Sequence, residues 1–344
     1  MLKKIEVTRD TLTMHYPASW WRDTWREALV CGNGRMGASF YGGTRLQTIM
    51  ITDGELWYGG FEDTLPDVHD ALERMRAKMD RGEYREASWE IVNELREKGY
   101  QTTLESPLPL ADIKIEIDPK GGFQEYQRAL NMETGEASCQ WTDSGVLYRC
   151  DGFVSRADGI AVYRIRAQQP VISASFRTEF HRNPGTPIPE TCRTMEENAQ
   201  PEASDGYLTY QSINTDGLRY GMAVRITTNG KQKIQYGRIY VEEADEIVLT
   251  IRSFIKDAGG DGIHRTKTFL SRLPESYESL FSRHVPLHRR KYLSARLELD
   301  GWQNTDNEDL LSRAYQDKQP LSVYQRNRRD SGPFSPVRPL GRRL

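Results

Sequence analysis

The commonest pattern in this chain is an alternation of apolar and polar side chains with a period of two residues. It is clearest in the segment 171–181, where one side carries Ile172, Ala174, Phe176 and Phe180 and the other carries serine, arginine and glutamate. Successive side chains of a strand point to opposite faces, so this pattern predicts a strand with one buried face. The same alternation recurs at 222–226 and 247–251.

Short turn signals separate these runs along most of the chain. Each combines glycine with a second glycine, serine, aspartate or asparagine, and they lie at Gly121-Gly122, Ser144-Gly145, Ala157-Asp-Gly159, Asp205-Gly206 and Asn229-Gly230. Such residues accept the backbone angles that tight turns require. Many short strands joined by frequent turns predict a mostly-β fold, namely a large antiparallel super-β-sandwich.

Two segments follow a helical period instead. After Pro66 the apolar positions are Val68, Leu72, Met75 and Met79, and after Gly82 they are Tyr84, Ala87, Ile91 and Leu95. This spacing predicts a helix hairpin inserted into the sandwich. Its methionine stripe is best explained as packing and does not indicate a cofactor site.

A third helical pattern begins near Glu275 and includes His284 and His288. Two histidines four residues apart share one helix face, as in a zinc-binding helix. Pro286 lies between them, however, no glutamate adjoins either histidine, and the nearby sequence offers no obvious third ligand. We therefore expect a short C-terminal helical linker, with no bound metal and no other cofactor.

Composition narrows the classes of function. The 344 residues can bury a large core, and the formal net charge of -2 does not provide the concentrated positive surface that nucleic acid requires. The N-terminus has two lysines but no apolar run behind them, and no stretch approaches the length of a membrane span. A cytoplasmic protein that binds neither nucleic acid nor membrane is the expectation.

The four cysteines, Cys31, Cys139, Cys150 and Cys192, lack the spacing of metal ligands. Cys139 and Cys150 lie symmetrically about the turn at 143–145, so they could face each other across a hairpin. In a reducing cytosol we expect two packed thiols there rather than a disulfide.

Two turns near the N-terminus carry the most suggestive polar residues. Glycines at 32, 34 and 37 allow a tight turn from which Asn33 and Arg35 would project, and a second segment carries Asp53, Glu55 and Trp57. Hydrogen-bonding groups beside an aromatic ring suit the hydroxyl groups and the ring face of a sugar. The alternative is structural, with the glycines forming a hairpin, Arg35 a surface ion pair and Trp57 part of the core.

Several ordered motifs together resemble the opening of glycoside hydrolase family 95, the inverting alpha-L-fucosidases. They are Leu12-Thr-Met-His-Tyr-Pro-Ala18, the segment 25–38, Phe40-Tyr-Gly-Gly43, Thr52-Asp-Gly-Glu-Leu-Trp57, Gly82-Glu-Tyr-Arg-Glu-Ala87, Tyr126-Gln-Arg-Ala-Leu-Asn-Met132 and Tyr148-Arg-Cys-Asp-Gly-Phe-Val-Ser155. The ordered set covers roughly residues 10 to 300. Thr52 and Asp53 depart from the family pattern, which has Asn and Glu at these positions.

The resemblance implies an N-terminal β-sandwich domain over 1–272, a helical linker over 273–318 and, in the family, an (α/α) barrel that carries the catalytic residues. This chain is expected to stop short of that barrel, so no catalytic residue is carried over. Asp53 and Glu55 are only two residues apart, and on one strand they would be closer than an inverting pair needs. The polar candidates Asn33, Arg35, Asp53, Glu55 and Trp57 are instead expected to face the substrate pocket or the barrel.

The last segment, 319–344, is rich in proline and arginine and poor in apolar residues, which predicts disorder or a frameshifted tail. A basic tail for nucleic acid is the functional alternative.

Three hypotheses follow. The first is the N-terminal domain of an alpha-L-fucosidase-like enzyme, inactive alone, whose partners are the missing barrel and a fucosylated oligosaccharide. The second is a stand-alone carbohydrate-binding sandwich, and the third a non-enzymatic sandwich that mediates protein association.

Overall fold

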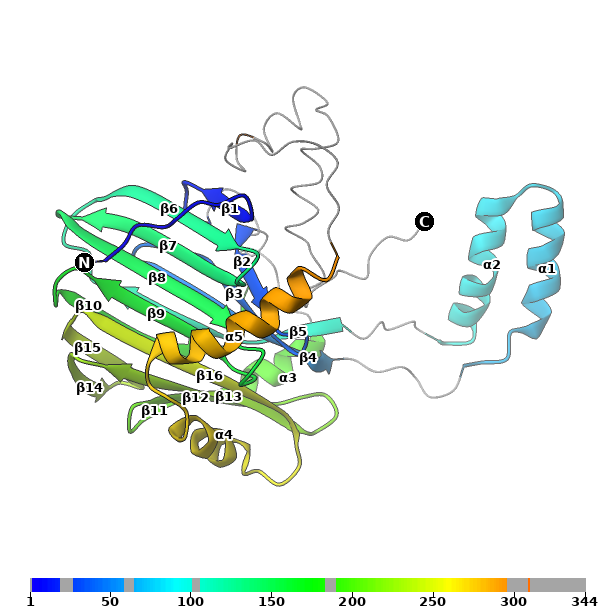
Figure 1. Ribbon diagram of the computed structural model, residues 1–344. Helices are drawn as coiled ribbons and strands as arrows, with labels where there is room; N and C mark the ends of the chain where they lie inside the picture. The colour runs from blue at the N-terminus through cyan, green and yellow to red at the C-terminus, as the bar shows by residue number, and fades with distance from the viewer. Residues whose placement is uncertain are drawn as a thin grey trace. The chain divides into compact units, whose positions relative to one another are not determined.

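The computed structural model describes residues 2–18, 27–58, 65–100, 106–182, 190–295 and 309. Two large sheets dominate these residues, and their neighbouring strands run antiparallel (Figure 1). The predicted mostly-β sandwich is therefore confirmed. The tail expected at 319–344 and most of the linker expected beyond Tyr292 lie outside the described residues.

The first sheet has the order β1-β6-β7-β8-β9-β16-β13-β12-β11. Its strands are β1 (Thr11–Met14), β6 (Phe123–Asn131), β7 (Glu136–Asp143), β8 (Val146–Val154), β9 (Ala161–Ala167), β11 (Gln200–Ser204), β12 (Tyr207–Ile213), β13 (Arg219–Thr228) and β16 (Glu246–Asp257). The second sheet has the order β14-β15-β10-β5-β4-β3-β2. Its strands are β2 (Leu29–Gly32), β3 (Met36–Phe40), β4 (Leu46–Tyr58), β5 (Ser106–Ile117), β10 (Ile172–Glu179), β14 (Lys231–Gln235) and β15 (Arg238–Ala244).

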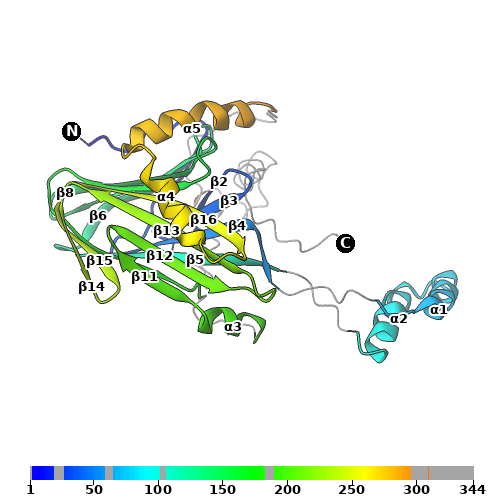
Figure 2. The ribbon, with the colours of Figure 1, turned by 90° about the horizontal axis from the view of Figure 1, so that it is seen from below.

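The sheets stack face to face and bury the apolar side of each strand between them (Figure 2). On β10, for example, Ile172, Ala174 and Phe176 are buried, as their alternation predicts. Phe40 of β3 stacks on Tyr163 of β9, with ring centroids 5.4 Å apart. Burial of such large side chains is the main source of the sandwich's stability.

Two helices cover the outer face of the first sheet: α4 (Gly262–Ser271) and α5 (Tyr277–Tyr292) (Figure 2). Leu270 of α4 and Leu280 of α5 join Phe153, Val162 and other buried residues of the sheet in one apolar cluster. A further helix, α3 (Glu190–Glu197), contacts β12. The helix α5 falls within the range expected for the linker, although the boundaries of that linker remain a prediction.

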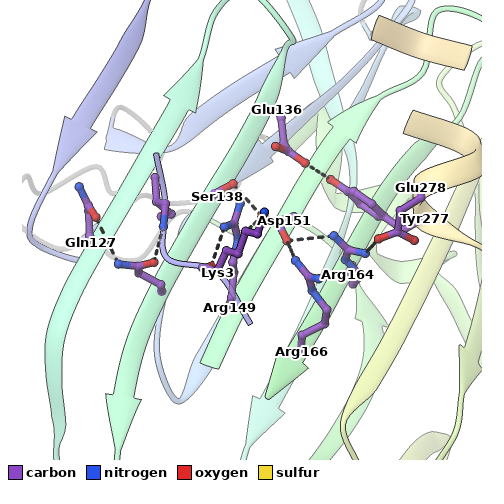
Figure 3. Close-up of polar contacts among 12 residues, drawn as sticks. Lys3, Gln127, Glu136, Ser138, Arg149, Asp151, Arg164, Arg166, Tyr277 and Glu278 are labelled. Carbon is purple, nitrogen blue, oxygen red and sulfur yellow. Dashed lines mark hydrogen bonds and ion pairs between the residues drawn. The ribbon is translucent and has the colours of Figure 1, made fainter. Parts of the chain in front are cut away.

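A polar network holds α5 to the same sheet (Figure 3). The hydroxyl of Tyr277 donates to Glu136 at 2.7 Å, and the guanidinium of Arg164 lies 3.8 Å from the centre of the Tyr277 ring and pairs with Glu278. Arg164 also contacts Asp151, which is buried and pairs with two further arginines. Buried charges require such partners, so this network fixes the position of the helix.

The chain divides into two compact units, the sandwich (1–56 and 108–344) and an inserted unit (57–107). The inserted unit contains the predicted helix hairpin, α1 (His69–Asp80) and α2 (Tyr84–Glu97), which confirms that prediction. Ala71 and Ala87 are its buried helical residues, and Arg74 of α1 pairs with Glu90 of α2 at 2.7 Å. None of the described helices is long and apolar enough to cross a membrane.

Candidate functional site

The turn between β2 and β3 is built around Asn33. Its side-chain Oδ1 accepts hydrogen bonds from the backbone N–H groups of Arg35 and Met36, at 3.0 and 2.9 Å. Gly34 has a φ of +100°, and a Cβ added there would meet nothing within 4 Å. The expected tight turn is thus present, and glycine supplies the backbone angle rather than a close approach.

Asn33 also ties this turn to the other sheet. Its Nδ2 donates to the backbone carbonyl of Ser155, just beyond β8, at 3.0 Å. The next residue, Arg156, donates back to the carbonyl of Asn33 at 2.9 Å. Asn33 is therefore a structural link between the β2–β3 turn and the β8–β9 turn, and its own amide is largely used within the protein.

Asp53 is a buried carboxylate on β4, with 3% of its surface exposed. The hydroxyl of Ser253, on β16, donates to its Oδ2 at 2.8 Å, and the backbone N–H of Glu55 donates to its Oδ1 at 3.1 Å. Arg35 approaches the same carboxylate at 3.8 Å. These partners stabilise a charge that burial alone would destabilise.

Arg35 and Glu55 form the exposed part of the same cluster. Their side chains are 60% and 57% exposed, and the nearest guanidinium and carboxylate atoms lie 3.9 Å apart. Arg35 lies between the two carboxylates because its backbone carbonyl accepts from Gly54, which separates Asp53 from Glu55 on β4. An exposed ion pair of this kind contributes little stability, so both groups can be offered to a partner at little cost.

Two arginines that the sequence analysis did not single out extend the cluster. Arg252 lies beside Ser253 on β16, and its guanidinium stacks 3.7 Å from the centre of the Phe269 ring. Burial, together with the nearby charge of Arg35, lowers the pKa of Arg252. Arg156 immediately follows the motif that ends at Ser155, and burial lowers its pKa too. Arg156 could have been identified from the sequence, because it directly follows a motif shared with the family. Nothing in the sequence connects Arg252 to Arg35.

We call this group of eight residues the polar end of the sandwich: Asn33, Arg35, Asp53, Glu55, Arg156, Asp158, Arg252 and Ser253. Asp158 belongs to it because its backbone carbonyl accepts from Arg252 and its carboxylate pairs with Arg283 of α5 at 2.7 Å. The polar end combines exposed donors and acceptors with two buried carboxylates, Asp53 and Asp158. Such a surface suits a polar partner, either a sugar or another protein domain.

Trp57 is the fifth residue that the sequence analysis proposed. It is half-buried near the end of β4 and belongs to the inserted unit.

The two histidines on α5 lie within hydrogen-bonding distance of backbone groups. Both are buried: His284 accepts from the N–H of Arg156 through Nδ1 at 3.2 Å, so Nε2 is the donor to the carbonyl of Thr134 at 2.9 Å. His288 Nε2 lies 3.0 Å from the carbonyl of Met132. Among the described residues, no three His, Cys, Asp or Glu side chains gather closely enough to hold a metal ion. The helix runs through Pro286 without a break.

The fold defines the class of the protein: a domain built on a two-sheet antiparallel β-sandwich. The sequence profile described as "Glycosyl hydrolase family 65, N-terminal domain" matches residues 12–253. This match covers more than half of the chain, so the chain belongs to that family. The expected kinship with glycosidase N-terminal domains is confirmed.

The chain is also similar to individual proteins. The chain is 25% identical over 307 residues to "Alpha-L-fucosidase 2" of Arabidopsis thaliana, covering 80% of this chain and 36% of that protein. It is 26% identical over 164 residues to "Probable alpha-fucosidase A" of Aspergillus oryzae, covering 47% and 22%. The chain therefore spans about a third or less of these relatives. A solved structure titled "Putative kojibiose phosphorylase from human microbiome" aligns with a TM-score of 0.48 and 11% identity, over 83% of this chain and 38% of that one.

Proposed function

We propose that this chain forms the N-terminal sandwich of an enzyme that hydrolyses glycosidic bonds, and that the intact enzyme acts on fucosylated oligosaccharides. The observation that carries the first part is the family match over residues 12–253. The second part is supported by the names of the two curated relatives, both of them fucosidases. In this proposal the domain covers 1–272 and the helical linker 273–318.

The role we propose for the polar end is to contact the catalytic barrel and close one side of its substrate pocket. Arg35 and Glu55 suit this role because both are exposed and the ion pair between them is weakened by solvent. Arg35 would pair with a carboxylate of the barrel, and Trp57 would form part of the pocket wall.

Asp53 and Glu55 are not proposed as a catalytic pair. An inverting glycosidase needs an acid and a base about 6.5–9.5 Å apart on opposite sides of the sugar. Asp53 is buried and already accepts two hydrogen bonds, so neither a sugar nor a reacting water has ready access to its carboxylate. In this proposal the chain contributes shape and contacts, while the reacting groups come from the barrel.

A binding experiment tests the proposed interface. The part of the Arabidopsis relative that lies outside the matched region is titrated with the full chain by calorimetry. Arg35→Glu should weaken binding at least tenfold, because it places a carboxylate against the barrel's own acidic partner. Lys231→Glu is the matched control, because Lys231 of β14 is a similarly exposed cation that pairs with Glu243 of β15, and it should leave binding unchanged.

Equal effects of the two substitutions would contradict the interface. The second hypothesis, a stand-alone sugar-binding domain, predicts instead that fucosylated oligosaccharide binds saturably to the chain alone and that Trp57→Ala abolishes this binding.

A further inference from the structure

A pair of cysteines lies directly across the β7–β8 hairpin. Cys139 of β7 is the register partner of Cys150 of β8, and both are free thiols with 5% and 1% exposure. They lie on the inner side of the first sheet, facing the second sheet. The predicted arrangement of two packed thiols is therefore present, and the proposed glycosidase function does not use it.

The hairpin sets the spacing of the pair. The turn consists of Ser144 and Gly145, and both residues have a positive φ. The pair of opposing residues next to this turn is Asp143 with Val146. A two-residue hairpin closes on a hydrogen-bonded pair, and the pair types then alternate along the ladder. Cys139 and Cys150, four positions further on, therefore form a hydrogen-bonded pair with Cα atoms about 5.5 Å apart, which lies within the range of disulfides.

A glutamine from the opposite sheet contacts both sulfur atoms. Gln47 of β4 is 1% exposed, and its Nε2 lies 3.7 Å from the Sγ of Cys139 and 3.8 Å from the Sγ of Cys150. One amide group thus donates toward two thiols, a contact that favours negative charge on sulfur. By contrast, the buried Cys31 donates to a backbone carbonyl, that of Gly152.

The two thiols differ in acidity. Hydrogen bonds from Cys150 and Gln47 lower the pKa of Cys139. Burial raises the pKa of Cys150 well above its ordinary range. This asymmetry gives the pair one sulfur that ionises first and one that remains a thiol, which is the division of roles that disulfide formation needs.

We propose that Cys139 and Cys150 are a redox-active pair that forms a reversible disulfide when the protein meets a peroxide. The Cys139 thiolate attacks one peroxide oxygen, the O–O bond breaks, and Cys139 becomes a sulfenic acid while water is released after protonation. The Cys150 sulfur then attacks the Cys139 sulfur, the S–O bond breaks and a second water leaves with the Cys150 proton. Overall, two thiols are oxidised to one disulfide and one peroxide is reduced to two waters.

The same geometry makes the bond reversible. Although the Cα spacing permits the bond, the side chains of a hydrogen-bonded pair lie farther apart than those of the alternate pairs, so a disulfide must draw the two Cβ atoms together and is strained. Strained disulfides are reduced more easily than structural ones. Oxidation also replaces the thiols that Gln47 contacts, and it thereby alters one of the polar contacts between the two sheets.

The test exposes the folded full chain to hydrogen peroxide, which is small enough to enter through local opening of the structure. The protein is then unfolded, alkylated and mapped by mass spectrometry. The expected product is a cross-linked pair of peptides containing Cys139 and Cys150, about 2 Da lighter than their sum, with Cys31 and Cys192 alkylated as thiols. Added reduced glutathione should restore all four thiols.

Variants separate this proposal from adventitious oxidation. Gln47→Leu keeps the side chain's bulk but removes the donor, so the cross-link should form several-fold more slowly, while Cys31→Ala should leave its rate unchanged. In Cys150→Ser, Cys139 should proceed to a stable sulfenic or sulfinic acid, a readout that does not depend on Gln47→Leu folding correctly. The proposal is overturned if Cys139 and Cys150 remain thiols in the folded chain, or if the cross-link appears only after unfolding.

Discussion

At the scale of single residues, two carboxylates with similar positions in the sequence, Asp53 and Glu55, differ in burial. Asp53 and Glu55 flank one glycine on the same strand, and Arg35 approaches both. Asp53 accepts from Ser253, a residue 200 positions away, whereas Glu55 is 57% exposed. The first residue joins the two sheets and the second is available to a partner.

This difference predicts unequal effects on stability. Asp53→Ala leaves the Ser253 hydroxyl and the Glu55 N–H without their acceptor, which should cost about 1–3 kcal/mol of unfolding free energy. Glu55→Ala should change it by less than about 0.5 kcal/mol. Urea denaturation of both variants at neutral pH measures the two losses, and losses of equal size would contradict the assignment of Asp53 as a buried link.

At the scale of elements, the attachment of α5 contains one carboxyl group whose pKa lies near neutrality. Burial, with the nearby charge of Asp151, raises the pKa of Glu136 to about 7 from an ordinary value of 4.5. The folded protein therefore favours the protonated acid. Its contribution to stability is fully present below pH 4.5 and is lost as the pH rises through about 7.

Glu136→Gln should remove this dependence, because the amide can still accept from Tyr277 but cannot ionise. Relative to the wild type, the variant should become more stable by on the order of 1–3 kcal/mol between pH 4.5 and pH 8. Urea unfolding curves across this range provide the comparison. A difference that does not vary with pH would show that Glu136 keeps an ordinary pKa.

The pKa of His284 shifts in the opposite direction to that of Glu136. Burial, with His288 nearby, lowers its pKa to about 4 from an ordinary value of 6.5. The folded state favours the neutral ring, so this contribution is present above pH 6.5 and is lost as the pH falls through about 4. Relative to the wild type, His284→Asn should gain stability steadily on acidification from pH 6.5 to 4. A constant difference would contradict a buried neutral His284.

The loop beneath α5 offers a steric test of the same attachment. Gly135 has a φ of +68°, and a Cβ there would lie 2.7 Å from the His288 ring. Gly145 has a φ of +80° with open space around it. Gly145→Ala should therefore cost only backbone strain, about 1 kcal/mol, and Gly135→Ala a further 1–3 kcal/mol, both measured by urea unfolding. Similar losses would indicate that the loop and α5 are not in close contact.

Some of these elements can be predicted from local sequence patterns, and others cannot. The strand β10 and the helices α1 and α2 follow local periodicity, so they were predictable. The turn at Asn33 was predictable from its glycines. The hydrogen bond from Ser253 to Asp53 joins β16 to β4, and the charge of Arg35 in the β2–β3 turn lies near Arg252 of β16. No local pattern encodes which strands of two sheets face each other. The sequence therefore predicts the members of the polar end on β4 and the β2–β3 turn, but not those on β16 or the aspartate in the β8–β9 turn.

At the scale of the whole molecule, the sandwich and the inserted hairpin are separate compact units, and the family match lies over both. The chain covers 36% of the length of its Arabidopsis relative. Our central proposal is that the chain shapes a carbohydrate-processing site without supplying the reacting acids.

The most direct measurement is hydrolysis of an aryl α-L-fucoside by the purified full chain, compared with Asp53→Asn and Glu55→Gln. The account predicts no turnover above the buffer background for any of the three proteins. Turnover by the wild type that either substitution abolishes, in a variant that still folds, would contradict it.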